Sequence, residues 1–131
     1  MNLIREINDG QIIKNQEDTR KYLSEFKNED REFFIVLGLD TQNKVLYREV
    51  VAIGTLNKTI IHPREVFKTA ITKSVHSIII AHNHPSGTTN PSKEDQDMTK
   101  KLKACGELLD IKLLDSIIIT SKEHNSIINN Q

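Results

Sequence analysis

The sequence predicts an α/β (α+β) fold, a single mixed β-sheet flanked by helices. The chain has 131 residues, which is the length of one domain. Two runs rich in apolar residues, many of them β-branched or aromatic, lie at 33–39 and 77–82 and are typical of buried strands. Elsewhere, apolar residues recur every three to four positions among charged ones, which is the pattern of helices that cover a sheet.

The N-terminal region predicts an arm followed by a helix. Residues 1–15 hold few apolar anchors, and we expect a short strand or an ordered arm there, ahead of one domain that spans residues 16–131. Residues 16–26 carry apolar side chains at helical spacing. Asn15 is suited to cap this helix, because its side chain can accept a hydrogen bond from a free backbone N–H.

The next segments predict a β-hairpin. Residues 32–39 are too rich in β-branched and aromatic side chains for a surface helix, so we interpret them as a buried strand. Residues 40–43 are a turn signal, and residues 44–53 are therefore expected to pair with the first strand. A further short strand is expected at residues 58–61.

The remaining segments predict two helices and three strands. One helix begins with Pro63, whose missing N–H costs no hydrogen bond there, and the other begins at Ser92, with a capping box that Asp95 completes. We expect strands at residues 77–82 and 111–120, and a last one that ends at residue 128. The expected core-facing residues of the two helices are Val66, Phe67, Ala70 and Ile71 in the first, and Met98, Leu102, Cys105, Leu108 and Leu109 in the second.

Composition and charge narrow the possible functions. The 18 basic and 18 acidic side chains balance, which removes the basic excess that nucleic-acid-binding proteins usually show. The longest apolar run is far shorter than the ~20 residues of a membrane span, and the first residues lack the apolar stretch of a signal peptide. The single cysteine, Cys105, excludes an internal disulfide. We therefore expect a cytoplasmic protein with no membrane partner.

Two histidines at the end of a predicted strand are the strongest chemical signal. Side chains at positions i and i+2 of a strand share a face, so the imidazoles of His82 and His84 can reach one ion. Asp95, which lies in the first turn of the next helix, completes a three-ligand set that leaves a fourth position open to water, as in catalytic zinc sites. Ser92 and Asp95 also have a purely structural interpretation as capping residues of that helix.

Other zinc chemistries fit less well. A closed structural site usually includes thiolates, and zinc deaminases need Cys-x-x-Cys, whereas this chain has one cysteine. Amidohydrolases that use His-x-His need a barrel of about 250 residues, which is far more than this chain holds. An open site with two histidines and an aspartate is the arrangement that the composition allows.

The residues around these positions resemble a known signature. Residues 82–95 satisfy His-x-His-x7-Ser-x2-Asp, the signature of the JAMM (MPN+/JAB) metalloproteases, at every spacing. More narrowly, the chain is similar to RadC-family JAB-domain proteins over residues 16–128. The segments that carry this narrower resemblance are Leu56-Asn57, His62-Pro63-Arg64-Glu65, His82-Asn83-His84-Pro85-Ser86-Gly87, Pro91-Ser92, Thr99 and Leu113-Leu114-Asp115. The implied fold is the JAB/MPN sandwich, which is cytidine-deaminase-like.

The sequence departs from the family pattern in two places. RadC proteins usually carry an N-terminal helix-hairpin-helix segment, their DNA-associated part, and this sequence has no counterpart of it. Ser116 stands where the family commonly has histidine.

The resemblance implies a role for each residue of the site. His82, His84 and Asp95 would be ligands of Zn²⁺, and Ser92 would stabilise the oxyanion. A glutamate near the start of an upstream strand would be the general base, and Glu32 stands where the motif has it. There are two alternatives for the base: Glu49, which we expect on an exposed or ion-paired face, and Glu65, whose place in the first turn of a helix is explained by the helix dipole.

The implied function is zinc-dependent hydrolysis of a peptide or isopeptide bond in a peptide or protein substrate. One alternative is a RadC-like protein that binds nucleic acid in DNA repair or with mobile elements, and the neutral charge speaks against it. Another is a non-catalytic MPN scaffold, and the complete ligand set speaks against that. No pattern in the sequence specifies an oligomeric state.

Overall fold

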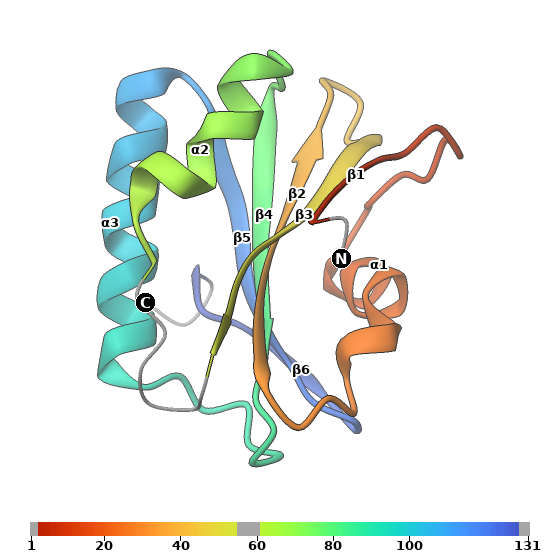
Figure 1. Cartoon of the computed structure of the whole chain (residues 1–131), viewed down its shortest axis with the longest axis vertical. Helices are drawn as coiled ribbons and strands as arrows, with labels where there is room; N and C mark the ends of the chain where they lie inside the picture. Colours follow the sequence, from red (N-terminus) through yellow and green to blue (C-terminus); the bar gives the residue numbers. More distant parts are fainter. Residues whose placement is uncertain (1–2, 55–60, 129–131) are drawn as a thin grey trace.

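The computed structural model describes residues 3–54 and 61–128, which contain six strands and three α-helices (Figure 1). The strands are β1 (Ile4–Glu6), β2 (Glu32–Leu39), β3 (Val45–Gly54), β4 (Ser77–Asn83), β5 (Lys112–Ile119) and β6 (His124–Ser126). The helices are α1 (Gln16–Tyr22), followed by a 3-10 turn (Ser24–Phe26), α2 (Pro63–Thr72) and α3 (Lys93–Leu109). The short strand expected at residues 58–61 lies almost wholly outside the described residues.

The six strands form one mixed sheet in the order β1-β3-β2-β4-β5-β6. Neighbouring strands are antiparallel except β4 and β5, which run parallel because α3 carries the chain back along the sheet between them. α2 and α3 cover one face of the sheet, and α1 lies against the other (Figure 1). The predicted mixed sheet flanked by helices is confirmed. Within the described residues, no helix combines the length and apolar character needed to cross a bilayer.

Local chemistry explains where several elements begin and end. The side chain of Asn15 accepts a hydrogen bond from the backbone N–H of Asp18 at 2.9 Å, and this caps α1 as the sequence predicts. Oδ1 of Asp40 accepts hydrogen bonds from the N–H groups of Gln42 and Lys44, which closes the turn between β2 and β3. The predicted hairpin therefore forms with its turn in the expected place.

An apolar cluster stabilises each face of the sheet, and β4 supplies residues to both. All seven residues of β4 are buried, which matches its unbroken apolar run. The N-terminal arm adds to the same sheet, because β1 pairs with β3 and Ile13 is buried in the cluster on the α1 side. The site described below includes residues at the end of β4, the strand whose residues are all buried.

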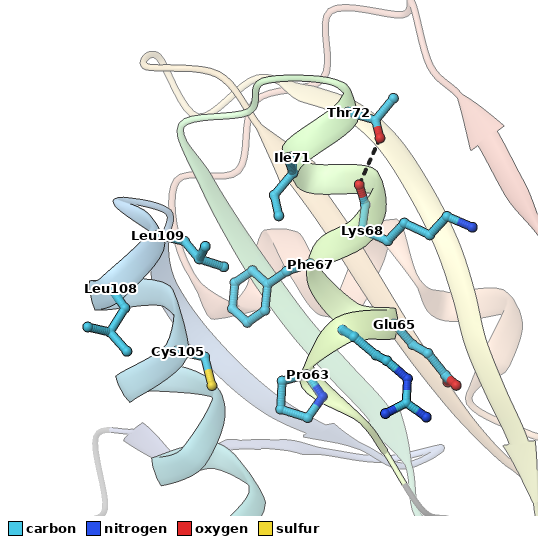
Figure 2. A pocket seen from close by; sticks show the side chains of 10 residues that line it. Pro63, Glu65, Phe67, Lys68, Ile71, Thr72, Cys105, Leu108 and Leu109 are labelled. Atoms are coloured by element: carbon cyan, nitrogen blue, oxygen red, sulfur yellow. Dashed lines mark hydrogen bonds between the residues drawn. The ribbon is translucent and has the colours of Figure 1, made fainter.

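Three apolar residues that the sequence assigned to the core are exposed instead. Ile71 of α2 is 54% exposed, and Leu108 and Leu109 of α3 are 88% and 44% exposed. Ile71 and the two leucines border an open, largely apolar groove of about 790 Å³ between α2 and α3, which Figure 2 shows from close by. Cys105, expected as a core residue, is only partly buried and lines the same groove.

The inward face of α3 differs in part from the expected one. The buried residues of the helix are Thr99, Leu102 and Gly106. Leu102 was expected there, and the expected Met98 and Cys105 are partly buried against the same cluster. Gly106 allows a close approach to the next segment, because a Cβ there would lie 2.3 Å from the carbonyl oxygen of Ile111. Thr99 and Gly106 therefore belong to the face of α3 that meets the sheet together with the predicted Leu102, and the apolar pattern alone does not reveal them.

Glu49, expected on an exposed or ion-paired face, is half-buried against α2, where the Thr69 hydroxyl and the Lys68 ammonium act on it. One of its carboxylate oxygens is buried and has no hydrogen-bond partner among the described residues. Burial raises the pKa of Glu49, and the Thr69 hydroxyl and the Lys68 ammonium offset only part of this effect.

We expect the Glu49→Gln substitution to increase the free energy of unfolding more at pH 8 than at pH 4. A carboxyl whose pKa is raised in the folded state favours folding below its ordinary value of 4.5, and that contribution is lost as the pH rises through the raised folded-state pKa. Urea unfolding of wild type and variant at both pH values measures the difference. The exposed Glu29→Gln substitution is the control, and a Glu49→Gln effect that is equal at both pH values would contradict this account.

Candidate metal centre

Four side chains with metal-binding atoms converge at one end of the sheet: Glu32, His82, His84 and Asp95. One donor atom from each lies within 4.8 Å of the other three. Glu32 is the first residue of β2, His82 lies near the end of β4, His84 follows that strand, and Asp95 lies in the first turn of α3. The structure thus brings together the predicted metal ligands and the predicted general base.

Strand pairing explains why Glu32 lies beside the histidines. β2 and β4 are antiparallel neighbours, and Phe34 is paired with His82. Side chains two positions apart in a strand share a face of the sheet, so Glu32 lies on the face of Phe34, and His84 lies on the face of His82. Two residues beyond the Phe34–His82 pair, the antiparallel register places Glu32 opposite His84. The fourth residue arrives on α3, whose N-terminus lies at the same end of the sheet (Figure 1).

The three predicted ligands are in mutual contact. Nε2 of His82 lies 3.1 Å from Nε2 of His84. Oδ1 of Asp95 lies 3.4 Å from Nε2 of His82, and Oδ2 of Asp95 lies 3.2 Å from Nε2 of His84. The Nε2 atoms of both histidines and the aspartate carboxylate therefore face one common point.

Packing and one hydrogen bond orient the two imidazoles. The His82 ring is fully buried and stacks on Phe34, with ring centroids 6.0 Å apart. Nδ1 of His84 lies 2.9 Å from the carbonyl oxygen of Thr88. Because a carbonyl oxygen only accepts, His84 must carry its proton on Nδ1 to make this bond, and its Nε2 lone pair is then free for an ion.

A capping box holds Asp95 in place. Its Oδ2 accepts a hydrogen bond from the backbone N–H of Ser92 at 2.9 Å, and Oγ of Ser92 accepts one from the N–H of Asp95 at 3.0 Å. The structural interpretation of these two residues is therefore correct, and the same geometry presents the carboxylate to both histidines. Capping and ligation are compatible uses of one side chain.

The electrostatic environment sets different proton affinities for the two carboxyl groups. Burial alone would raise the pKa of Asp95, but contact with the His82 and His84 rings outweighs burial and holds the pKa well below its usual range. For Glu32, burial raises the pKa, and the two histidines offset only part of the increase. Burial lowers the pKa of His84, but contact with Asp95 outweighs it, so the net shift is upward. The pKa values of Asp95 and Glu32 are therefore shifted in opposite directions.

The alternative glutamates lie elsewhere. Glu49 packs against α2, as described above, and Glu65 is exposed on the first turn of α2 beside the groove. Neither belongs to the cluster of metal-binding side chains found among the described residues. Glu32 is therefore the only one of the three candidate glutamates placed beside the histidines.

Ser116, at the position where the resemblance implies a histidine, is a buried residue that contacts α3. Its Oγ lies 2.9 Å from Oγ1 of Thr99, inside the interface between β5 and α3. Thr99 lies one helical turn after Asp95 on the same helix. The serine therefore helps to fix the helix that carries Asp95.

Sequence reasoning missed Asn83, the residue between the two histidines. Asn83 is 1% exposed, and its side chain bonds to the backbone on both sides of Glu32. The signal that could have identified it is a polar residue directly after a run of buried apolar strand residues, because a buried amide needs hydrogen-bond partners. The contacts of Phe34 and Thr88 were also missed, and they depend on strand pairing and loop path that no local pattern reveals.

Comparison with known proteins gives a consistent assignment. The family described as RadC-like JAB domain matches residues 13–131. A UPF0758 protein of Geobacillus thermodenitrificans is 46% identical over 121 residues, which are 92% of this chain and 54% of that protein. A UPF0758 protein of Staphylococcus haemolyticus is 50% identical over 106 residues, 81% of this chain and 46% of that protein.

This chain spans about half the length of the curated relatives that it matches. The part of this chain that matches the family, residues 13–131, contains all four residues of the cluster. The family match, the mixed sheet and the converging side chains agree with one another. The chain belongs to the family of RadC-like JAB-domain proteins.

Proposed function

We propose that this chain is a zinc-dependent hydrolase of JAMM type, which cleaves a peptide or isopeptide bond in a peptide or protein substrate. One observation carries the proposal: Nε2 of His82 lies 3.1 Å from Nε2 of His84, and the two oxygens of the Asp95 carboxylate lie 3.4 Å and 3.2 Å from these nitrogens, respectively. Bonds of about 2.0–2.1 Å to a tetrahedral zinc ion place neighbouring donor atoms about 3.3 Å apart. The two imidazoles and the carboxylate therefore already have about the spacing that zinc ligands require.

The donor set is also that of a catalytic rather than a structural zinc site. Two imidazoles and one carboxylate are typical of zinc hydrolases, which keep a fourth position for water or substrate. When bound, the ion lowers the pKa of a coordinated water and polarises the scissile carbonyl. His82, His84 and Asp95 would hold it.

Glu32 supplies the proton transfer in this proposal. Its carboxylate lies within 4.8 Å of the donor atoms of the other three residues, close enough to receive a proton from water held among them. Burial raises the pKa of Glu32, which makes its carboxylate a stronger base than an exposed one. The same carboxyl then delivers the proton to the leaving amine.

Ser92 stabilises the oxyanion in this proposal. The hydrogen bond that its Oγ accepts from the N–H of Asp95 fixes the position of the oxygen and leaves its own hydrogen available. Ser92 is exposed, so a substrate carbonyl can approach it. Such a donor acts mainly on the developing charge, so it is expected to affect kcat more than KM.

Metal-dependent incorporation of solvent oxygen tests this function. Zinc-loaded protein is incubated in H₂¹⁸O with an internally quenched peptide library and with peptides branched through a lysine isopeptide bond. We expect cleavage of at least one class, one ¹⁸O atom in the new carboxyl group, loss of activity with a chelator, and recovery with zinc. No cleavage of either class, or cleavage that persists after the metal is removed, would contradict the proposal.

A further inference from the structure

Asn83 is a buried amide inside the site for which the proposed chemistry has no use. It is the last residue of β4, between His82 and His84, and it is 1% exposed. Its Oδ1 accepts a hydrogen bond from the backbone N–H of Phe33 at 2.6 Å. Its Nδ2 donates one to the carbonyl oxygen of Arg31 at 2.8 Å. The two backbone groups that it binds lie immediately before and after Glu32.

These two hydrogen bonds continue the sheet beyond the end of its backbone pairing. The ladder between β2 and β4 ends where Phe34 pairs with His82. A carboxamide has an acceptor oxygen and an N–H donor, as a peptide group does. The side chain of Asn83 therefore replaces the next pair of backbone hydrogen bonds between the strands. It binds the start of β2, which the backbone of β4 no longer pairs with.

The two hydrogen bonds of Asn83 lie at the start of β2. Glu32 is the first residue of the strand and follows a charged segment, and strand and helix ends are where ordered backbone is lost most easily. On its other edge Glu32 pairs with Gly54, the last residue of β3. Asn83 thus supplies the attachment of Glu32 to the strand that carries the histidines.

We propose that Asn83 is a positioning residue, which fixes the Glu32 carboxylate relative to the two histidines. The proposal rests on the proposed function, in which Glu32 transfers the proton. Asn83 would link two parts of the site through one side chain, because the backbone of Asn83 separates the histidines and its carboxamide holds the glutamate. Neither serine nor alanine reaches both backbone groups, and aspartate accepts from Phe33 but cannot donate to Arg31.

We expect the Asn83→Ala substitution to lower kcat by roughly 10- to 100-fold, because a displacement of a catalytic group by about 1 Å can cost a factor of 100. KM is expected to stay within about twofold and zinc content at one ion per chain, since Asn83 supplies no ligand. The Ser126→Ala substitution is the matched control, because it also removes a hydrogen bond of a buried side chain, the one that Ser126 Oγ donates to Asp115 between β6 and β5. It is expected to lower stability and leave kcat unchanged.

A double-mutant cycle separates positioning from general damage. If Asn83 acts through Glu32, adding Asn83→Ala to the Glu32→Gln variant leaves the residual kcat within about twofold. A loss in the double variant equal to the product of the two single losses would overturn the proposal. Asn83→Asp is the second variant in case Asn83→Ala does not fold, and we expect it to keep the contact with Phe33 and lose part of kcat.

Amide hydrogen exchange, followed by NMR on the zinc-loaded protein, decides the proposal without any substrate. In wild type the Phe33 N–H is expected to exchange slowly, and in Asn83→Ala at least about 10-fold faster, with Val36 further along β2 unchanged. Equal Phe33 exchange in both proteins would overturn the proposal even if hydrolysis is observed. Absence of hydrolysis in wild type would instead count against the proposed function, and this exchange test would still report on Asn83.

Discussion

Replacing Asp95 with alanine is expected to abolish stoichiometric zinc binding and to weaken zinc affinity by more than about 100-fold. Loss of a residue that only orients a metal ligand lowers metal affinity by up to about 100-fold. A larger loss is expected for Asp95, because in the proposed site it supplies a donor atom itself. The carboxylate is the only anion among the three proposed ligands, and its depressed pKa keeps it charged. Zinc content after dialysis, together with competition against a chromophoric chelator, measures the loss.

Ser92→Ala is the matched control for this substitution. Asp95→Ala also removes half of the capping box, which costs about 0.5–2 kcal/mol of helix stability in general. Ser92→Ala removes the other half without removing a ligand, so it should lose similar stability and keep one zinc ion per chain. If Asp95→Ala retained full zinc, or if both variants lost zinc equally, Asp95 would not be a ligand.

Replacing Glu32 with glutamine is expected to lower kcat by about 10²- to 10⁴-fold while zinc content and KM stay close to wild type. Glutamine keeps the shape of the side chain but cannot take up a proton, and a general base contributes a factor of this size. Glu32 is the member of the cluster that the proposed zinc site does not use as a ligand. Single-turnover kinetics on the best peptide from the library measures the chemical step directly.

The rejected glutamates provide the controls for this prediction. Glu49→Gln and Glu65→Gln make the same chemical change at positions against α2 and on its exposed surface. Both variants are expected to keep kcat within about twofold of wild type. A loss of kcat in either of them as large as that of Glu32→Gln, or full activity in Glu32→Gln, would contradict the assignment of the base.

Most of the fold could be predicted because its strands and turns carry local signals. β2 and β4 are continuous β-branched and aromatic runs, which allowed their bounds to be placed within one residue. Asn15 and Ser92 marked the starts of α1 and α3 through their ability to accept backbone N–H groups. The site was predictable for a related reason, since strand alternation alone places His82 and His84 on one face.

What could not be predicted depends on neighbours that are distant in the sequence. The inward face of α3 includes Thr99 and Gly106, whose small size matters only because Ser116 and Ile111 approach them. The role of Asn83 follows from the point at which β2 and β4 stop pairing, and strand order is not visible in local patterns. Hydrophobic periodicity therefore located the elements but not the contacts that position the site.

The most direct test of the central claim is an anomalous difference map, measured at the zinc absorption edge, from crystals of the zinc-loaded protein. The account predicts one peak per chain, bonded at about 2.0–2.1 Å to Nε2 of His82, Nε2 of His84 and the Asp95 carboxylate. Glu32 should lie beside the peak without bonding to it. A peak at any other residues, or no peak in fully loaded protein, would contradict the assignment of this site as a catalytic zinc centre.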